Sequence, residues 1–201
     1  MNVTLLDYGA GNVTSVARAL RRLGAQVFTT NQPEAIATAE RLILPGVGHC
    51  AALITALDAY GLRQPLLHAI ARGTNFLGIC LGLQALYETS DEAPSLAGLG
   101  LLPGRVTHLP SGVKLPHMGW NQLQHAKISR LLDGISPEAY FYFAHSYAAP
   151  ASGPESIAVC EHGRAFIAVV EQRNIFGVQF HPEKSGVPGA KLLENFLRLA
   201  A

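Results

Sequence analysis

The segment around Cys80 constrains the fold of this chain more than any other. An apolar run at residues 75–79 leads into it, a helix-like run at residues 81–87 leaves it, and Gly78 and Gly82 flank the cysteine. A strand, a tight turn and a helix with glycines beside a central nucleophile form the nucleophile-elbow pattern, here with cysteine in place of serine. Glycine permits so close an approach of the two elements, and the turn lifts the thiol above the sheet edge. The pattern predicts a reactive cysteine at the end of a strand.

Two features near Cys80 predict an oxyanion hole. The helix that follows aims its N-terminal N–H groups and its dipole at the sulfur, which favours the thiolate, and the Leu81 N–H lies where an oxyanion would form. Residues 44–48 read Leu-Pro-Gly-Val-Gly, a turn whose glycines let backbone N–H groups point at an anion. If the strand before this turn lies beside the nucleophile strand, Val47 and Gly48 complete the hole with Leu81.

His181 is the best candidate for the base that a nucleophilic cysteine needs. A thiol with a pKa of about 8.5 is only a few per cent ionised at neutral pH without such a base. Among the eight histidines, His181 ends an apolar strand, in the run Gly-Val-Gln-Phe-His-Pro-Glu. Pro182 has no N–H and ends the strand ladder. Glu183 faces the same side as His181 and can accept its second ring N–H, which predicts a triad of Cys80, His181 and Glu183.

The order of the elements predicts an α/β fold. Strands are expected at residues 2–7, 26–30, 41–44 and 75–79, and helices at residues 12–23, 34–39, 51–60 and 62–72, the first capped by Asn12 and stopped by Gly24. This alternation predicts a mostly parallel central sheet flanked by helices on both faces. Ligands in such sheets bind outside the carboxyl ends of the strands, where Cys80 falls.

The second half of the chain is richer in strands. These are expected at residues 104–109, 118–123, 140–146, 156–161, 165–170 and 175–180, and we expect an additional antiparallel part from them. Residues 189–199 predict an amphipathic helix with Leu192, Leu193, Phe196 and Leu197 on one side. Without a repeat or a convincing linker, residues 1–201 are expected to form a single domain.

Composition excludes several classes of function. The net charge of +1 argues against nucleic acid or an acidic membrane surface as a partner. Charged residues make up 14% of the chain, against roughly 25% in an average globular protein, which predicts a large core or a face covered by another protein. No apolar run reaches the ~18–20 residues of a membrane span, and we expect a cytoplasmic protein. Cys50, Cys80 and Cys160 form neither a ligand set nor a disulfide framework, so we expect no metal and no cofactor.

The two motifs around Cys80 and His181 together resemble the class I, or triad, glutamine amidotransferases. More narrowly, the chain is similar to the glutaminase subunits of imidazole glycerol phosphate synthases. The narrower resemblance rests on blocks that occur in order from residue 7 to residue 185, namely Asp7-Tyr8-Gly9-Ala10-Gly11-Asn12, Leu44-Pro45-Gly46-Val47-Gly48, Gly98-Leu99-Gly100-Leu101-Leu102-Pro103-Gly104, Pro116-His117-Met118-Gly119-Trp120-Asn121, Tyr142-Phe143-Ala144-His145-Ser146-Tyr147 and His181-Pro182-Glu183-Lys184-Ser185.

The resemblance implies the chemistry. In the reaction that the resemblance implies, Cys80 attacks the side-chain amide of glutamine to give a thioester and ammonia. His181, oriented by Glu183, transfers the protons. The remaining substrate-binding residues that it implies are Gln84, Glu92, Ser146 and Tyr147. For Glu92 a solvated acid in a polar loop remains an alternative.

The resemblance also implies a partner. Members of this family pass the ammonia to a (β/α)8-barrel cyclase subunit, in a heterodimer that forms imidazole glycerol phosphate and AICAR in histidine biosynthesis. Asn12, Trp120 and Lys184 match positions that face this partner, although a core position for Trp120 remains an alternative. The chain departs from the family pattern at His49 and Cys50, both of which we expect to be packing residues, and at residues 186–189.

Three other functions remain open. The chain can be the glutaminase of another synthase, such as that of pyridoxal phosphate synthesis, although the block at residues 118–121 argues against it. A cysteine peptidase or thioesterase of related fold is a second alternative, disfavoured by a pocket specific for one amino acid. The third is a catalytically silent or latent regulatory subunit. Slow turnover by the free subunit is expected in particular, because the N–H donors of the loop at residues 46–48 can point away until the partner's substrate binds.

Overall fold

An eight-stranded sheet runs through the centre of the computed structural model, which describes residues 1–9, 12–125 and 127–200. In chain order its strands are β1 (Asn2–Leu6), β2 (Gln26–Thr30), β3 (Arg41–Gly46), β4 (Asn75–Cys80), β8 (Gln124–His125), β11 (Ser156–Glu161), β12 (Ala165–Gln172) and β13 (Ile175–Val178). In space they follow the order β2-β1-β3-β4-β13-β12-β11-β8. The first five in this spatial order pair in parallel, and β12, β11 and β8 continue the sheet antiparallel. The predicted mostly parallel sheet with an antiparallel second half is confirmed.

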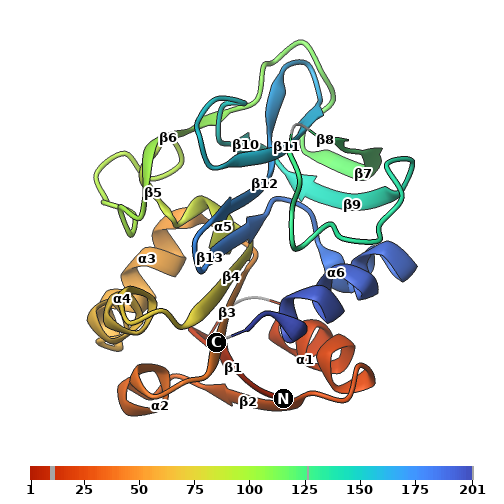
Figure 1. Ribbon diagram of the computed structural model, residues 1–201. Coiled ribbons are helices and arrows are strands. Elements are labelled where there is room, and N and C mark those ends of the chain that lie inside the picture. The colour runs from red at the N-terminus through yellow and green to blue at the C-terminus, as the bar shows by residue number, and fades with distance from the viewer. Residues whose placement is uncertain (10–11, 126, 201) are drawn as a thin grey trace.

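Helices cover both faces of this sheet, as the alternation predicts. They are α1 (Val13–Arg22), α2 (Pro33–Ala37), α3 (Cys50–Ala59), α4 (Arg63–Ala71), α5 (Leu81–Gln84) and α6 (Gly186–Arg198), with a 3-10 turn, η1, at Pro182–Lys184. In Figure 1, α1 and α6 lie on one side of the sheet, and α3 and α4 lie on the other. Each side has its own apolar cluster, one including Leu20 and Phe196 and the other including Leu57 and Leu66. The predicted apolar side of the last helix is confirmed, because its four residues are all fully buried.

Two smaller sheets lie beyond the carboxyl-end edge of the central sheet (Figure 1). One pairs β7 (His117–Gln122) with β9 (Tyr140–His145), and the other has the order β10 (Tyr147–Ala148), β6 (Leu102–His108), β5 (Tyr87–Ser90). The expectation of a helix from residue 81 to residue 87 is wrong, because α5 ends at Gln84 and Tyr87 begins a strand that pairs in parallel with β6. Tyrosine and threonine favour strands, and the buried Tyr87 ring fits a pleated surface better than a helix. The two-residue strands β8 and β10 were also not predicted.

The start of α1 differs from its prediction. Asn12 occupies the N-cap position, but its side chain makes no capping hydrogen bond and instead reaches the carboxylate of Glu183. Ala10 and Gly11, which belong to the block at residues 7–12 that carries the family resemblance, lie outside the described residues. Within the part of the chain that the structure covers, no helix has the length and apolar character needed to cross a bilayer.

The glycines around Cys80 are required by close backbone approach. A Cβ atom on Gly82 would overlap the carbonyl oxygen of Leu44 in β3, and one on Gly78 would lie 2.5 Å from the carbonyl oxygen of Gly82. Neither obstacle is a flexible side chain, so neither can move aside without shifting the sheet. The tight packing of α5 onto β3 and β4 therefore depends on the absence of side chains here.

Gly82→Ala is expected to lower the free energy of unfolding by about 3 kcal/mol, measured by urea denaturation. The steric overlap outweighs the gain of about 1 kcal/mol that alanine brings to a helix. Gly112→Ala is the matched control, since a Cβ there meets no atom within 4 Å, and its effect should stay within about 0.5 kcal/mol. Equal stabilities of the two variants would contradict the packing argument.

Candidate active site

Cys80 occupies the sharp turn between β4 and α5. Its φ of +54° and ψ of −106° lie where residues with a side chain are rare, and Arg173 is the one other non-glycine residue with positive φ in the described part of the chain. A strained backbone of this kind is what a nucleophile elbow uses to present its side chain. The predicted strand, turn and helix are confirmed as local structure.

His181 and Glu183 lie beside the nucleophile. The backbone N–H of His181 donates to the carbonyl oxygen of Tyr142 at 2.8 Å, which fixes the residue just after β13. The Nδ1 atom of His181 lies 3.0 Å from Oε1 of Glu183, and the two side chains are 2% and 0% exposed. Asn12 Nδ2 donates to the same Oε1 atom at 3.0 Å. The carboxylate is therefore held from two sides, and one of its partners is a residue predicted to face a second subunit.

The electrostatics of this group favour a charged imidazole. Burial alone would lower the pKa of His181, but hydrogen bonds with Cys80 and Glu183, together with the charges of both, raise it to about 10. An imidazolium that persists at neutral pH stabilises a neighbouring thiolate and can donate a proton to a leaving group. The arrangement has the geometry of a nucleophile, an acid–base group and an orienting carboxylate.

The glycine-rich loop lies beside the elbow. Gly46 pairs with Cys80 in the register of β3 and β4, so the condition for a shared oxyanion hole is met. In this structure, however, the N–H of Val47 donates to the hydroxyl of Tyr8 at 3.3 Å. Burial raises the pKa of Tyr8 to about 12, so the phenol stays neutral at physiological pH. Val47, one of the expected oxyanion donors, is therefore bonded to the side chain of Tyr8, which follows the end of the neighbouring strand β1.

One cavity of about 180 Å³ brings the predicted residues together. It is smaller than the roughly 300–1,000 Å³ of pockets for drug-sized ligands. Its lining contains all predicted oxyanion and substrate residues and two of the three catalytic ones, namely Val47, Gly48, Cys80, Leu81, Gln84, Glu92, Ser146, Tyr147 and His181. Glu183 lies behind His181, bonded to it, and does not line the cavity.

Gln84 and Glu92 are both tied to the protein. The amide nitrogen of Gln84 donates to the carbonyl oxygen of Tyr147 at 2.7 Å and to Oε1 of Gln179 at 3.0 Å, which leaves its oxygen to face a ligand. Oε2 of Glu92 accepts from the backbone N–H of Cys50 at 2.8 Å, at the start of α3. The alternative of a solvated acid for Glu92 is wrong, because the side chain is half-buried and fixed by a helix N-terminus.

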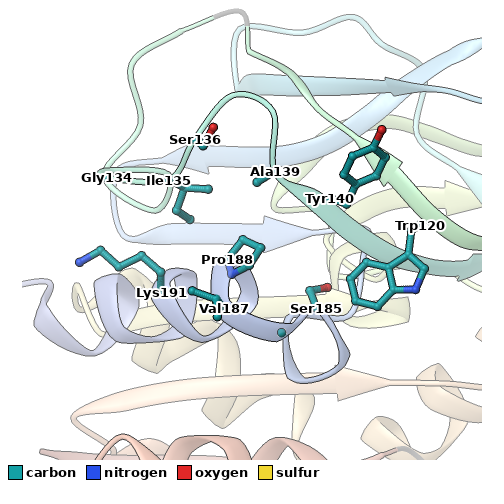
Figure 2. A pocket seen from close by; sticks show the side chains of 11 residues that line it. Trp120, Gly134, Ile135, Ser136, Ala139, Tyr140, Ser185, Val187, Pro188 and Lys191 are labelled. Atoms are coloured by element: carbon teal, nitrogen blue, oxygen red, sulfur yellow. The ribbon is translucent and has the colours of Figure 1, made fainter.

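Trp120 and Lys184 lie on an exposed surface next to the cavity. The Trp120 side chain is 56% exposed, so the alternative of a core tryptophan is wrong. Its ring meets that of Tyr142 edge to face at 6.0 Å, and Nζ of Lys184 lies 5.7 Å from the centre of the same ring. Figure 2 shows Trp120 and Tyr140 on one side of an apolar groove of about 640 Å³, with Val187 and Pro188 of α6 on the other.

His49 and Cys50 behave differently from each other. Cys50 is buried at the start of α3, as expected of a packing residue, and burial raises the pKa of its thiol. The expectation of packing is wrong for His49, which is exposed and caps α3 by accepting the N–H of Ala51 at Nδ1, 3.1 Å away. A histidine at an N-cap satisfies a donor that the helix leaves free.

Several residues around the cavity were missed by the sequence analysis. Tyr8 and Gln179 lie within the motifs around Cys80 and His181 and the block at residues 7–12, but a motif does not show which backbone or side-chain atom a residue contacts.

His117 and His145 face each other across β7 and β9, with Nδ1 of His117 3.1 Å from Nε2 of His145, and His162 stacks on His117 at 4.2 Å. Burial, then the neighbouring histidines, lowers the pKa of His117 to about 4, and burial above all lowers that of His145 to about 3. Only strand register, which spacing does not reveal, brings these rings together.

Comparisons with known proteins show the family of the chain. The family profile "Glutamine amidotransferase class-I" matches residues 4–200. "Imidazole glycerol phosphate synthase subunit HisH" of Desulfitobacterium hafniense is 48% identical over 195 residues, covering 96% of this chain and 92% of the relative. "Imidazole glycerol phosphate synthase hisHF, chloroplastic" of Arabidopsis thaliana is 44% identical over 200 residues, covering 97% of this chain and 34% of the relative. A solved structure described as a glutamine amidotransferase superposes with a TM-score of 0.77 at 21% identity, covering 97% of this chain and 96% of that one.

The α/β sheet and the elbow cysteine beside a histidine and a glutamate have the arrangement of a triad enzyme. The chain belongs to the class I glutamine amidotransferases and, within them, to the HisH subunits of imidazole glycerol phosphate synthase.

The buried histidines next to the cavity predict a loss of stability in acid. His117 and His145 are neutral when folded but titrate near 6.5 when unfolded, so the unfolded chain binds more protons between about pH 6.5 and pH 4. The free energy of unfolding should fall by about 1.4 kcal/mol per histidine for each pH unit below 6.5. His181, whose pKa is raised, is charged in the folded state throughout this range. It adds only a smaller slope of opposite sign near pH 6.5, which fades as the same histidine becomes charged in the unfolded chain. Urea unfolding from pH 7 to pH 5 measures this.

His117→Gln should flatten that pH dependence, because it removes one of the two titrating groups. His68→Gln, at an exposed position of α4, is the control and should leave the slope unchanged. A slope that is identical in all three proteins would show that the buried histidines are not its source.

Proposed function

We propose that this chain hydrolyses glutamine to glutamate and ammonia through Cys80, His181 and Glu183, and delivers the ammonia to a (β/α)8-barrel cyclase subunit of imidazole glycerol phosphate synthase. The observation that carries the proposal is the small cavity in which the elbow cysteine, its histidine and the candidate oxyanion donors meet. The proposal treats residues 1–201 as one amidotransferase domain, since the family profile spans residues 4–200. A cytoplasmic location fits three free cysteines.

In the first half of the reaction, the Cys80 thiolate attacks the carbonyl carbon of the glutamine side chain. The negative charge moves to the carbonyl oxygen, where the N–H groups of Leu81 and of the loop at residues 47–48 stabilise it. The carbon–nitrogen bond then breaks, and the His181 imidazolium gives its proton to the departing ammonia. The products of this half are a γ-glutamyl thioester, ammonia and neutral His181.

In the second half, neutral His181 takes a proton from water while the water oxygen attacks the thioester carbon. The carbon–sulfur bond breaks, its electron pair returns to Cys80, and glutamate leaves. Glu183 keeps the ring of His181 in one orientation through both halves, and the Asn12 amide holds Glu183 in turn. The thiolate and imidazolium are then restored.

The cavity favours a single amino acid as substrate. A volume of about 180 Å³ suits a small molecule and argues against the peptide of a cysteine peptidase or the long acyl chain of a thioesterase. Glu92 brings a carboxylate that can pair with a substrate ammonium group, and the Gln84 oxygen can accept a hydrogen bond from it. Ser146 and Tyr147, at the junction of β9 and β10, also line the cavity.

The exposed apolar face supports docking of the barrel subunit. Trp120, Met118, Tyr140 and Val187 are each more than half exposed, which is unusual for large apolar side chains grouped beside an active site. The hisHF relative supports the identity of the partner. This chain matches only 34% of that protein, so most of its length is left for a second, fused part. Asn12 bonds to Glu183 of the triad, and Lys184 lines the cavity and lies over the Tyr142 ring, so both predicted partner residues adjoin the site.

The proposed coupled glutaminase can be tested by glutamate release. The chain alone is expected to act slowly, and addition of a barrel cyclase subunit with its nucleotide substrate should raise the rate strongly. Cys80→Ala should lower the rate of the complex by at least about a thousandfold, since it removes the nucleophile. Trp120→Ala should lower the stimulation by weakening assembly, with the triad intact.

The two variants separate chemistry from docking. High partner concentration should restore the Trp120→Ala rate but not the Cys80→Ala rate. Absence of glutamate release in the wild-type complex, together with an elbow thiol that resists a glutamine-analogue alkylating agent, would instead support a silent regulatory subunit. Release of glutamate without any stimulation by the barrel would point to another synthase as the partner.

The bond between Val47 and Tyr8 predicts a way to raise the activity of the free chain. Tyr8→Phe removes the hydroxyl that accepts the Val47 N–H, so this donor becomes free to turn toward the cavity. The partner-free rate of glutamine hydrolysis should rise about fivefold, the value of one neutral hydrogen bond, and the stimulation by the partner should shrink. Tyr60→Phe, which changes a half-exposed hydroxyl, is the control. A Tyr8→Phe rate equal to or below that of the wild type contradicts this account of the slow free chain.

A further inference from the structure

Gln179 is a fully buried amide next to the nucleophile. It follows β13 directly, and because Val178 pairs with Ile79, Gln179 lies alongside Cys80 in the parallel register. Its side chain is 0% exposed, between the apolar neighbours Val178 and Phe180. An amide buried among apolar groups is costly unless its donor and its acceptor are both used. Its hydrogen bonds therefore indicate what it does.

The orientation of the Gln179 amide is fixed by its neighbour. Gln84 donates to the backbone carbonyl oxygen of Tyr147 at 2.7 Å, and a carbonyl can only accept, so this end of Gln84 is its NH2 group. The same nitrogen lies 3.0 Å from the Gln179 amide, which must then present its oxygen to Gln84. The NH2 group of Gln179 is left facing Cys80, with Nε2 3.6 Å from Sγ.

We propose that Gln179 is a positioning residue for the nucleophile, whose amide N–H holds the Cys80 sulfur as a thiolate and whose oxygen locks Gln84. This rests on the proposed thiolate chemistry of the triad. A donor aimed at sulfur favours the charged form, and a hydrogen bond to a charged atom is stronger than one to a neutral atom. Unlike His181, an amide neither gains nor loses a proton, so this donor persists throughout the cycle.

The same donor also serves the second half of the reaction. When water displaces the sulfur from the thioester, the electron pair of the carbon–sulfur bond returns to Cys80 while His181 is taking the proton of the water. The N–H of Gln179 then faces the charge that develops on the leaving sulfur. Gln179 is thus expected to assist release of glutamate as well as formation of the thiolate.

The test measures thiolate formation without requiring turnover. The free chain is treated with iodoacetamide from pH 5 to pH 9, and modification of the Cys80 peptide is followed by mass spectrometry. Gln179→Met keeps the length of the side chain but removes the donor, so alkylation near neutral pH should slow about tenfold, the size of one hydrogen bond to a charged group. Gln179→Glu should change the pH profile differently, because burial raises the pKa of the new carboxyl group and, once ionised at higher pH, it presents only acceptors to the sulfur and slows alkylation further.

The variants leave the other titratable groups around the sulfur in place. These are His181 with Glu183 behind it, Tyr8 from the end of β1, His145 at the end of β9, and Glu92 and Lys184 of the cavity lining. Asn195→Leu is the matched control, since Asn195 is a buried amide that donates to the carbonyl oxygens of Leu131 and Asp133, away from the cavity. It should lower stability without changing the pH profile of Cys80 alkylation.

The outcomes separate this inference from the proposed function. A Gln179→Met or Gln179→Glu protein that folds and alkylates at Cys80 with the wild-type pH profile overturns the positioning role, even if the wild type hydrolyses glutamine. A shifted profile in the variants supports that role, even if the wild type shows no glutaminase activity with a barrel partner. If Gln179→Met does not fold, the Gln179→Glu profile decides alone.

Discussion

The active site depends on the parallel pairing of β4 with β3 on one side and with β13 on the other. This pairing sets Gly46, Cys80 and the residues after Val178 at one edge of the sheet, so that a loop, a nucleophile and a histidine from three distant parts of the chain meet. Side chains alternate between the two faces of a strand. A slip of one residue in either register would therefore turn the loop after β3 or the histidine after β13 away from Cys80. The glycines let α5 pack directly onto β3 and β4, since a single added carbon at Gly82 would overlap the Leu44 carbonyl oxygen of β3.

Buried polar groups then connect the pieces. The carbonyl oxygen of Tyr147, the amides of Gln84 and Gln179, and the sulfur of Cys80 form one hydrogen-bonded chain across the cavity wall. Such a network specifies a unique arrangement, because each amide can satisfy its neighbours in one orientation only. Glu183 is held in the same way, between His181 and Asn12. The reactive sulfur and the orienting carboxylate are therefore each bonded to an amide that does not itself react, namely Gln179 and Asn12.

Sequence patterns predicted the sheet, the helices on both of its faces and the elbow, because hydrophobic periodicity and glycine spacing are local signals. The sequence-based predictions were wrong where contacts between distant parts of the chain determine the local structure. Tyr87 was assigned to a helix, yet its buried ring and its pairing with β6 make it part of a strand. Asn12 has the residue type of a helix cap, but a buried carboxylate 171 residues away is the stronger partner. The Tyr8 hydroxyl, the Gln179 amide and the stacked histidines act through atoms that converge only in the folded chain, so no spacing in the sequence identifies them.

The low charge content has a structural counterpart outside the core. Trp120, Tyr140 and Val187 keep apolar surface exposed around one groove, which also includes Ser185, four residues after His181. Lys184 belongs to both regions, since it lines the cavity and lies over the Tyr142 ring, against which Trp120 also packs. The backbone N–H of His181 donates to the carbonyl oxygen of this same Tyr142. Tyr142 therefore joins the two regions, because its ring meets Trp120 on the exposed face and its backbone holds His181 in the site.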